Sequence, residues 1–201
     1  MLLEFALKAI GADHAGVILL HGKQRLETAA ATDPVVAKID AIQMEVGEGP
    51  DLSVIEDRLA LTVSDTHADE RWPLWAAQVS AAGIRSLLSV RMYTTGETVG
   101  TLNLYSTKPD AFDLDDQAVA HVLARHAAVA LASARKVENL WQAVDARKRI
   151  GQAQGILMER FDLTAEQAFA VLLRYSQDNN VKLRAVADQL VETRDLPVRQ
   201  P

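Results

Sequence analysis

The chain contains no cysteine among its 201 residues. This absence excludes a disulfide framework, thiolate metal sites and every catalytic or cofactor-attachment chemistry that needs a thiol. Long hydrophobic runs are also missing, since no segment approaches the roughly 20 apolar residues of a membrane-spanning helix. The first residues, Met1-Leu2-Leu3-Glu4, lack the basic region and the cleavage site of a secretory signal. We therefore expect a cytoplasmic protein that has no membrane partner.

Residue patterns that would indicate catalysis or metal binding are scarce as well. The five histidines show no metal-ligand spacing, and His121 and His126 are five residues apart, so they do not share a helix face. The aspartates at 113, 115 and 116 are typical of a helix start, where carboxylates complement the helix dipole. The run 47–50, Gly-Glu-Gly-Pro, is too short and too acidic to hold a phosphate. We therefore expect no enzymatic activity, no metal and no resident cofactor.

The chain has fewer basic residues than is usual for a nucleic-acid-binding protein. The formal net charge is -6, with 21 Lys and Arg against 27 Asp and Glu. Residues 138–201 hold nine of each sign, which leaves 12 basic and 18 acidic residues in 1–137. A nucleic-acid site in the C-terminal part would therefore depend on a local patch and show only a modest salt dependence.

Up to about residue 112, short runs of strand-forming residues dominate the chain. They lie at 15–20, 26–30, 59–63, 86–92 and 99–105. The last two are joined by a loop with central Gly96, which is typical of a hairpin. A helical stretch from Leu74 to Ala82 precedes Gly83, a common helix stop. Strands with few long helices between them predict an antiparallel sheet with helices on its faces, an α+β domain.

From Asp113 onward the pattern is helical. Asp113 suits a helix N-cap, and apolar residues between Val119 and Val144 recur at roughly heptad spacing without an intervening proline. A helix of this length cannot bury its apolar stripe against one small domain. We therefore expect it to bridge two domains and to pair with a second copy as a coiled coil. The alternative is two helices with a break near Ser133.

Two shorter helices are predicted after Arg160. Thr164 and Gln167 have the spacing of a capping box, in which each side chain bonds the other residue's backbone amide. The asparagines at 179 and 180 end the first of these helices. Its buried face is predicted to hold Ala168, Val171, Leu172 and Tyr175, and the buried face of the second Leu183, Val186, Ala187, Leu190 and Val191. With the end of the long helix, they form a predicted three-helix bundle.

The segment from Arg147 to Arg160 has the features of a contact surface. Gly151 and Gly155 lie four residues apart inside a helix, where each glycine costs about 1 kcal/mol relative to alanine. Such a cost is usually accepted where another molecule or element comes close to the backbone. Cations and amides surround the two glycines. The alternative is that the glycines allow close helix packing and that the charges form a solvated face.

Several motifs, in order along the chain, resemble known families. The segments 147–160, 163–169, 172–174 and 182–187 resemble an ANTAR domain, a three-helix RNA-binding module of bacterial transcription antitermination regulators. The segments 46–50, 69–73, 83–86 and 100–105 resemble the GAF sensory domain that is commonly fused to it in actinobacteria. The resemblance implies a GAF-like domain over 1–133, an ANTAR-like domain over 134–196 that starts within the long helix, and a tail over 197–201.

This resemblance implies a signal-responsive, homodimeric regulator that binds RNA hairpins and is controlled by its GAF domain. The residues implied to contact RNA are Arg147, Lys148, Gly151, Gln154, Gly155, Arg174, Asn180, Lys182 and Arg184. Lys182 and Arg184 stand at the start of the last helix, where the dipole also favours an anion. Two alternatives stay open: a module whose C-terminal helices dock a protein partner without binding RNA, and a DNA-binding regulator.

A ligand pocket is a further hypothesis for the N-terminal domain. Its candidate residues are Trp72, Arg85, Asn103 and Tyr105, which would bind a small-molecule effector of undetermined identity. The alternative is that Trp72, Trp75 and Tyr105 are packing residues of the core.

Overall fold

The computed structural model describes residues 2–22, 25–57, 59–95 and 97–195. The predicted tail at 197–201 lies outside the described residues. The chain divides into two compact units, a first unit over residues 1–134 and a second unit over residues 135–201. One helix, α5 (Leu114–Phe161), contributes residues to both. None of the described helices combines the length and the apolar character that crossing a membrane requires.

A five-stranded sheet forms the centre of the first unit. The strands are β1 (His14–His21), β2 (Arg25–Ala31), β3 (Ala60–Val63), β4 (Ser86–Tyr93) and β5 (Thr98–Ser106). They lie in the order β2-β1-β5-β4-β3, and every neighbouring pair is antiparallel. All five predicted strand runs are therefore confirmed. The predicted hairpin joins β4 and β5, with the Thr94 amide donating a hydrogen bond to the Glu97 carbonyl at 3.0 Å.

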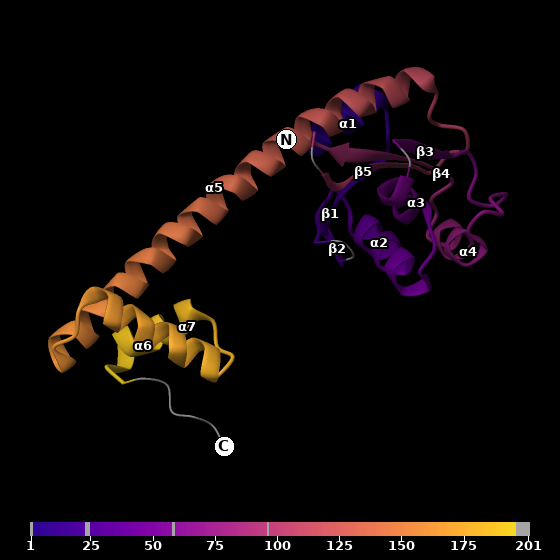
Figure 1. The fold of residues 1–201 in the computed structure, drawn as a ribbon. Helices are drawn as coiled ribbons and strands as arrows, with labels where there is room; N and C mark the ends of the chain where they lie inside the picture. Colours follow the sequence, from indigo (N-terminus) through magenta and orange to yellow (C-terminus); the bar gives the residue numbers. More distant parts are fainter. Residues whose placement is uncertain (1, 23–24, 58, 96, 196–201) are drawn as a thin grey trace. The chain divides into compact units, whose positions relative to one another are not determined.

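Helices cover both faces of this sheet (Figure 1). Helix α1 (Leu2–Ile10) and the first part of α5 pack on one face, whereas α2 (Pro34–Val46), α3 (Pro50–Asp57) and α4 (Pro73–Ala81) pack on the other. Because side chains alternate across a strand, Leu87 is buried against α2 and α4 while Leu88 is buried against α1 and α5. The α+β class predicted from the sequence is thus confirmed.

Helix α5 runs without interruption through Ser133, so the alternative of a break there is wrong. Asp113 caps its start as predicted, since one oxygen of that carboxylate accepts the backbone amides of Asp115 and Asp116, each at 2.9 Å. In the first unit α5 turns buried alanines such as Ala120 and Ala124 toward the sheet. These small side chains let the helix backbone approach the sheet closely.

In the second unit, the end of α5 packs with α6 (Ala165–Asp178) and α7 (Leu183–Thr193). The buried core consists of Ala153, Leu157, Ala168, Leu172, Val186, Ala187 and Leu190. The Thr164–Gln167 capping box is present in both directions, as predicted. One core assignment is wrong: Val171 is 37% exposed, because its position on α6 turns the side chain away from the other two helices.

Candidate nucleic-acid interface and buried polar centre

The two glycines of α5 lie on its exposed side in the second unit. Ala153 and Leu157 face the core, and Gly151 and Gly155 stand roughly half a helical turn away from them at 100° per residue. Apart from the neighbouring backbone of α5 itself, a Cβ atom added at either glycine would meet no atom of the described residues within 4 Å. Close packing inside this chain therefore does not account for the glycines. The backbone beside them is open to another molecule.

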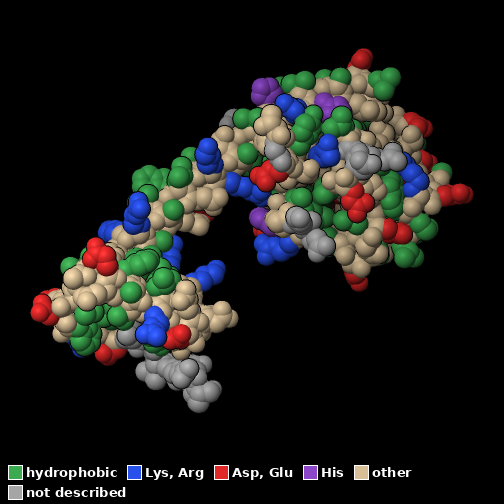
Figure 2. All heavy atoms as spheres, in the orientation of Figure 1, with side chains coloured by type: hydrophobic (Ala, Val, Ile, Leu, Met, Phe, Trp, Pro, Cys, Tyr) green, Lys and Arg blue, Asp and Glu red, His purple; other side chains and the backbone are tan. Residues whose placement is uncertain are grey.

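Four of the predicted cations are exposed in the second unit. Arg147, Lys148, Arg174 and Lys182 form no ion pair within the part of the chain that the structure describes. Figure 2 shows Lys and Arg side chains spread along α5 and around the helical bundle, with exposed hydrophobic side chains between them. Cations without a carboxylate partner keep their full charge for phosphate oxygens, which take half or more of the contacts in protein–nucleic acid complexes.

Arg184 differs from these four because it belongs to an ion-pair network between α5 and α7. Its Nη2 donates to Asp145 Oδ2 at 2.6 Å, and its Nε lies 3.6 Å from Asp188 Oδ2. Arg149 joins the same network, with its Nε 3.2 Å from Asp188 Oδ1 and its Nη2 3.8 Å from Glu192 Oε1. The charge of Arg184 is therefore partly neutralised within the chain.

The two predicted amide contacts also have structural roles. Gln154 Nε2 donates to the carbonyl of Ala165 at 3.0 Å, so this side chain ties α5 to the start of α6 and leaves its oxygen as an acceptor. Asn180 is exposed and follows the end of α6 with a φ of 51°, a left-handed conformation that asparagine tolerates better than most residues. Neither placement tests the proposed RNA contacts, which stay predictions.

A cavity of about 410 Å³ opens beside Gly155. It is lined by Gln152, Gly155, Ile156, Glu159, Val191 and Arg194. Gln152, Glu159 and Arg194 are not among the predicted site residues. Arg194 could not be placed here from the sequence, because only the folded bundle brings the end of α7 next to this turn of α5. The cavity adds an amide, a carboxylate and a guanidinium to the exposed glycine backbone.

Within the described residues, the predicted ligand residues of the first unit contact neighbouring side chains and line none of the three cavities given below. Trp72 packs edge-on against Trp75 at a centroid distance of 6.1 Å, and the guanidinium of Arg71 lies 4.5 Å above the Trp72 ring. Arg85 forms a bidentate ion pair with Asp65, in which Nε donates to Oδ1 at 2.9 Å and Nη2 donates to Oδ2 at 2.6 Å. The cavities of about 980, 560 and 410 Å³ in the described residues are lined by other side chains. Ligand binding by the four residues stays a prediction.

Asn103 and Tyr105 instead point into a buried polar centre, formed by Asp40, Gln43, Asp51, Ser89, Asn103 and Tyr105. The Asp51 carboxylate accepts hydrogen bonds from Gln43 Nε2 at 2.8 Å, Ser89 Oγ at 2.6 Å and Asn103 Nδ2 at 3.0 Å. The Asp40 carboxylate accepts from the Tyr105 hydroxyl at 3.0 Å and from Thr28 Oγ1 at 2.7 Å. These bonds tie α2 and α3 to strands β2, β4 and β5.

The buried polar centre holds two carboxylates without a cation. Neither Asp40 nor Asp51 has an ion pair with a Lys, Arg or His of the described chain. Burial and, second, the charge of Asp51 raise the pKa of Asp40 to about 7. Burial likewise raises the pKa of Asp51, against the effect of its hydrogen-bond donors. At least one of the two carboxyl groups is therefore expected to hold a proton close to neutral pH.

No group of three or more His, Cys, Asp or Glu side chains within the described residues could hold a metal ion. Asp40 and Asp51 were not predicted as a pair. In the sequence, Asp40 and Gln43 continue the helical spacing of Val36 and Ile39 on one face of α2. This spacing is a weak indication that the two polar side chains are buried.

These features define a two-domain protein in which an α+β domain precedes a three-helix module with an open helix face and exposed cations. Residues 1–132 match the GAF domain family, and residues 138–191 match the ANTAR domain family. The chain therefore belongs to the GAF–ANTAR regulators. Both domains are regulatory rather than catalytic in character. A comparison with curated proteins finds no match.

Solved structures support the fold of the first unit. A domain of a two-component sensor histidine kinase protein from Sinorhizobium meliloti 1021 is similar, with a TM-score of 0.59, 17% identity and coverage of 69% of this chain and 91% of that one. A GAF domain of Synechocystis sp. PCC6803 in its photoproduct state has a TM-score of 0.57, 14% identity and coverage of 69% and 94%. At these identities the similarity shows the fold alone.

Proposed function

We propose that this protein is a signal-responsive, homodimeric regulator that acts in the cytoplasm and binds RNA stem-loops through its ANTAR domain. Binding would promote transcription antitermination under the control of the GAF domain, without catalysis. The observation that carries the proposal is the open backbone at Gly151 and Gly155 beside Arg147 and Lys148, two exposed cations with no ion pair among the described residues. This combination occurs in a domain that belongs to an RNA-binding family.

RNA loops suit this surface better than a duplex does. Loop bases are splayed out, so a protein can contact phosphates and base edges at the same place. Arg147 and Lys148 supply the phosphate contacts, the glycines admit the RNA backbone, and the free oxygen of Gln154 accepts a hydrogen bond. Arg174 on α6 and Lys182, the residue before α7, are further exposed cations of the same domain.

The dimer is supported by an apolar stripe on α5 that nothing in the described chain covers. The stripe consists of Val119, Val122, Val129, Val137, Leu140, Trp141 and Val144, which are between 39% and 69% exposed. At 100° per residue these positions fall within about one third of the helix circumference. A second α5 packed along the stripe would remove these side chains from water.

The test is RNA binding by the full chain, measured by gel shift and fluorescence anisotropy with a tandem-hairpin RNA, a single-stranded RNA and duplex DNA. The double substitution Arg147→Ala and Lys148→Ala is expected to weaken tandem-hairpin binding at least tenfold. It should also reduce the slope of log affinity against log salt by about 1.4–1.8, as the loss of two phosphate contacts predicts.

Lys136→Ala is the matched control for the double substitution. Lys136 is an exposed cation on the same helix, outside the proposed contact surface, and its loss should change affinity by less than twofold. Duplex DNA binding equal to RNA binding would favour a DNA regulator. Absence of RNA binding at low salt would rule the proposal out.

Gly155→Ala gives a second prediction. Apart from the neighbouring backbone of α5, the added methyl group meets no atom of the described residues within 4 Å, so the thermal midpoint should stay the same or rise slightly, since alanine is the better helix former. RNA affinity should fall about tenfold if the RNA approaches this backbone. Sedimentation of the Gly155→Ala variant distinguishes RNA contact from helix packing at this glycine. An unchanged dimer with weaker RNA binding supports the proposal. Loss of the dimer indicates that the glycine serves helix packing instead.

A protein-docking function is the second candidate, and one observation favours it. Phe169 and Leu173, one turn apart on α6, are 38% and 37% exposed. An exposed aromatic and leucine at this spacing are typical of helix-mediated docking. Two results together would support this candidate. The wild-type chain would not bind RNA, and the Phe169→Ser variant would lose the cellular function of the protein.

A further inference from the structure

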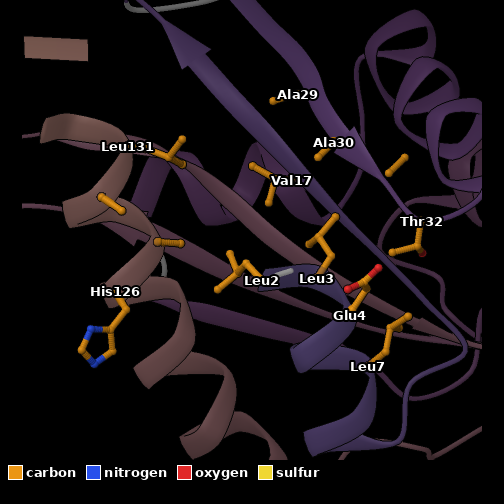
Figure 3. Close-up of a pocket in the computed structure, with 13 residues that line it drawn as sticks. Leu2, Leu3, Glu4, Leu7, Val17, Ala29, Ala30, Thr32, His126 and Leu131 are labelled. Atoms are coloured by element: carbon orange, nitrogen blue, oxygen red, sulfur yellow. The ribbon is translucent and has the colours of Figure 1, made fainter. Parts of the chain in front are cut away.

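A pocket of about 980 Å³ lies in the first unit, on the sheet face that carries α1 and α5 (Figure 3). Its walls come from α1, from β1 and β2, and from the last part of α5 within this unit. Val17 and Ala127 form part of the floor, at 6% and 5% exposure. The volume is at the upper end of the roughly 300–1,000 Å³ that small-molecule sites occupy.

The polar groups of this pocket stand at its ends. Figure 3 shows Leu2, Leu3, Val17 and Leu131 gathered around the middle, with the His126 ring at one side and Glu4 and Thr32 at the other. Most other lining residues are alanines. The lining contains no Lys or Arg that could pair with an anionic ligand. The Thr32 hydroxyl is already hydrogen-bonded to Ala15, whose amide donates to it at 2.9 Å and whose carbonyl accepts from it at 3.1 Å. An apolar body with one hydrogen-bonding end, directed at the His126 ring, fits this arrangement.

The opposite face of the sheet is filled by the protein itself. Trp75 and Tyr105 are 1% and 0% exposed there, and the two carboxylates of the buried polar centre are hydrogen-bonded to neighbouring side chains. An apolar molecule placed on that face would have to displace these hydrogen bonds. The pocket beside α1 and α5 requires no such displacement.

The apolar stripe of α5 overlaps part of the α5 wall of the pocket, because His126 and Ala130 lie in the same sector of the helix as the stripe. Ala127 and Leu131 line the pocket, and they lie roughly 140–200° around the helix from Val122 and Val129. A second copy of the chain packed on the stripe would therefore approach the pocket at His126 and Ala130, whereas Ala127 and Leu131 face away from it.

We propose that this pocket binds an uncharged hydrophobic small molecule with one hydrogen-bonding end, of the fatty alcohol class. The proposal goes beyond the RNA-binding function and does not depend on it. Four lining residues, at 126, 127, 130 and 131, belong to α5. A bound molecule thus contacts the helix that also supplies the first helix of the ANTAR domain.

The test uses the full chain and the neutral dye Nile red, displaced by dodecanol, dodecanoate or dodecylammonium. We expect a saturable, blue-shifted signal with one site per chain, and displacement by dodecanol at concentrations at least tenfold lower than by either charged compound. Ala130→Trp fills the pocket from the α5 side and should weaken dye binding at least tenfold. Ala29→Trp fills it from β2 and should do the same.

Ala118→Trp is the matched control, because Ala118 is an exposed alanine of α5 that does not line the pocket. It should leave the dissociation constant within twofold, as should Val122→Ser in the stripe. Three results would each overturn the proposal: no saturable binding, binding that survives both pocket-filling variants, or binding that occurs only in monomeric protein because a second copy covers the pocket.

Discussion

Asp40→Asn is expected to raise the free energy of unfolding of the first unit at pH 8 by roughly 2–4 kcal/mol, the equivalent of a pKa shift of up to about three units. The pKa of Asp40 is about 7 in the folded protein, against an ordinary value of 3.8. The folded state therefore binds more protons than the unfolded state between about pH 4 and 7. Stability falls as pH rises through this window, and asparagine removes the charge that causes the fall.

The measurement is urea unfolding at pH 5 and at pH 8, followed by the fluorescence of Trp72 and Trp75 in a Trp141→Phe background. The wild-type free energy of unfolding should be lower at pH 8 than at pH 5, and Asp40→Asn should reduce this difference. Asp33→Asn is the control on the same helix, because Asp33 caps α2 and asparagine caps a helix equally well. Equal pH dependence in both variants would contradict the assignment.

Helices and strands that are marked by a local residue pattern could be predicted from the sequence. Strand runs such as 86–92 and 99–105 carry enough apolar, β-branched or small residues between turn signals to be found alone. Helices α1, α2 and α3 were not predicted. In α2 the core-facing positions include Asp40 and Gln43, so the apolar stripe that identifies an amphipathic helix is interrupted. Their partners, such as Tyr105, lie too far along the chain to be inferred.

The candidate RNA site shows the same division between local and distant information. The sequence predicted Gly151 and Gly155 as part of a contact surface, and the structure places both on the exposed side of α5, away from Ala153 and Leu157. The ion pair between Arg184 and Asp145 spans 39 residues, so no local pattern could reveal it. Exposed cations can be predicted from a sequence, but whether a carboxylate neutralises them depends on tertiary packing.

The double substitution Leu140→Asp and Val144→Asp is expected to convert the proposed dimer into a monomer. Both side chains are 59% exposed, so the charges cost little in the single chain but would be buried without partners in a paired α5. Affinity for a tandem-hairpin RNA should fall by about 100-fold or more, because two linked contacts become independent ones. Affinity for one hairpin should change by less than threefold.

Light scattering coupled to size exclusion measures the oligomeric state, and anisotropy with one-hairpin and two-hairpin RNAs measures the affinities. Asn139→Asp with Gln142→Asp is the matched control, since it adds the same two charges to the opposite side of α5. A dimer that persists in the stripe variant would place the subunit contact elsewhere. A monomer that still prefers the tandem RNA would show that one chain reads both hairpins, and the stripe would then have no part in RNA selection.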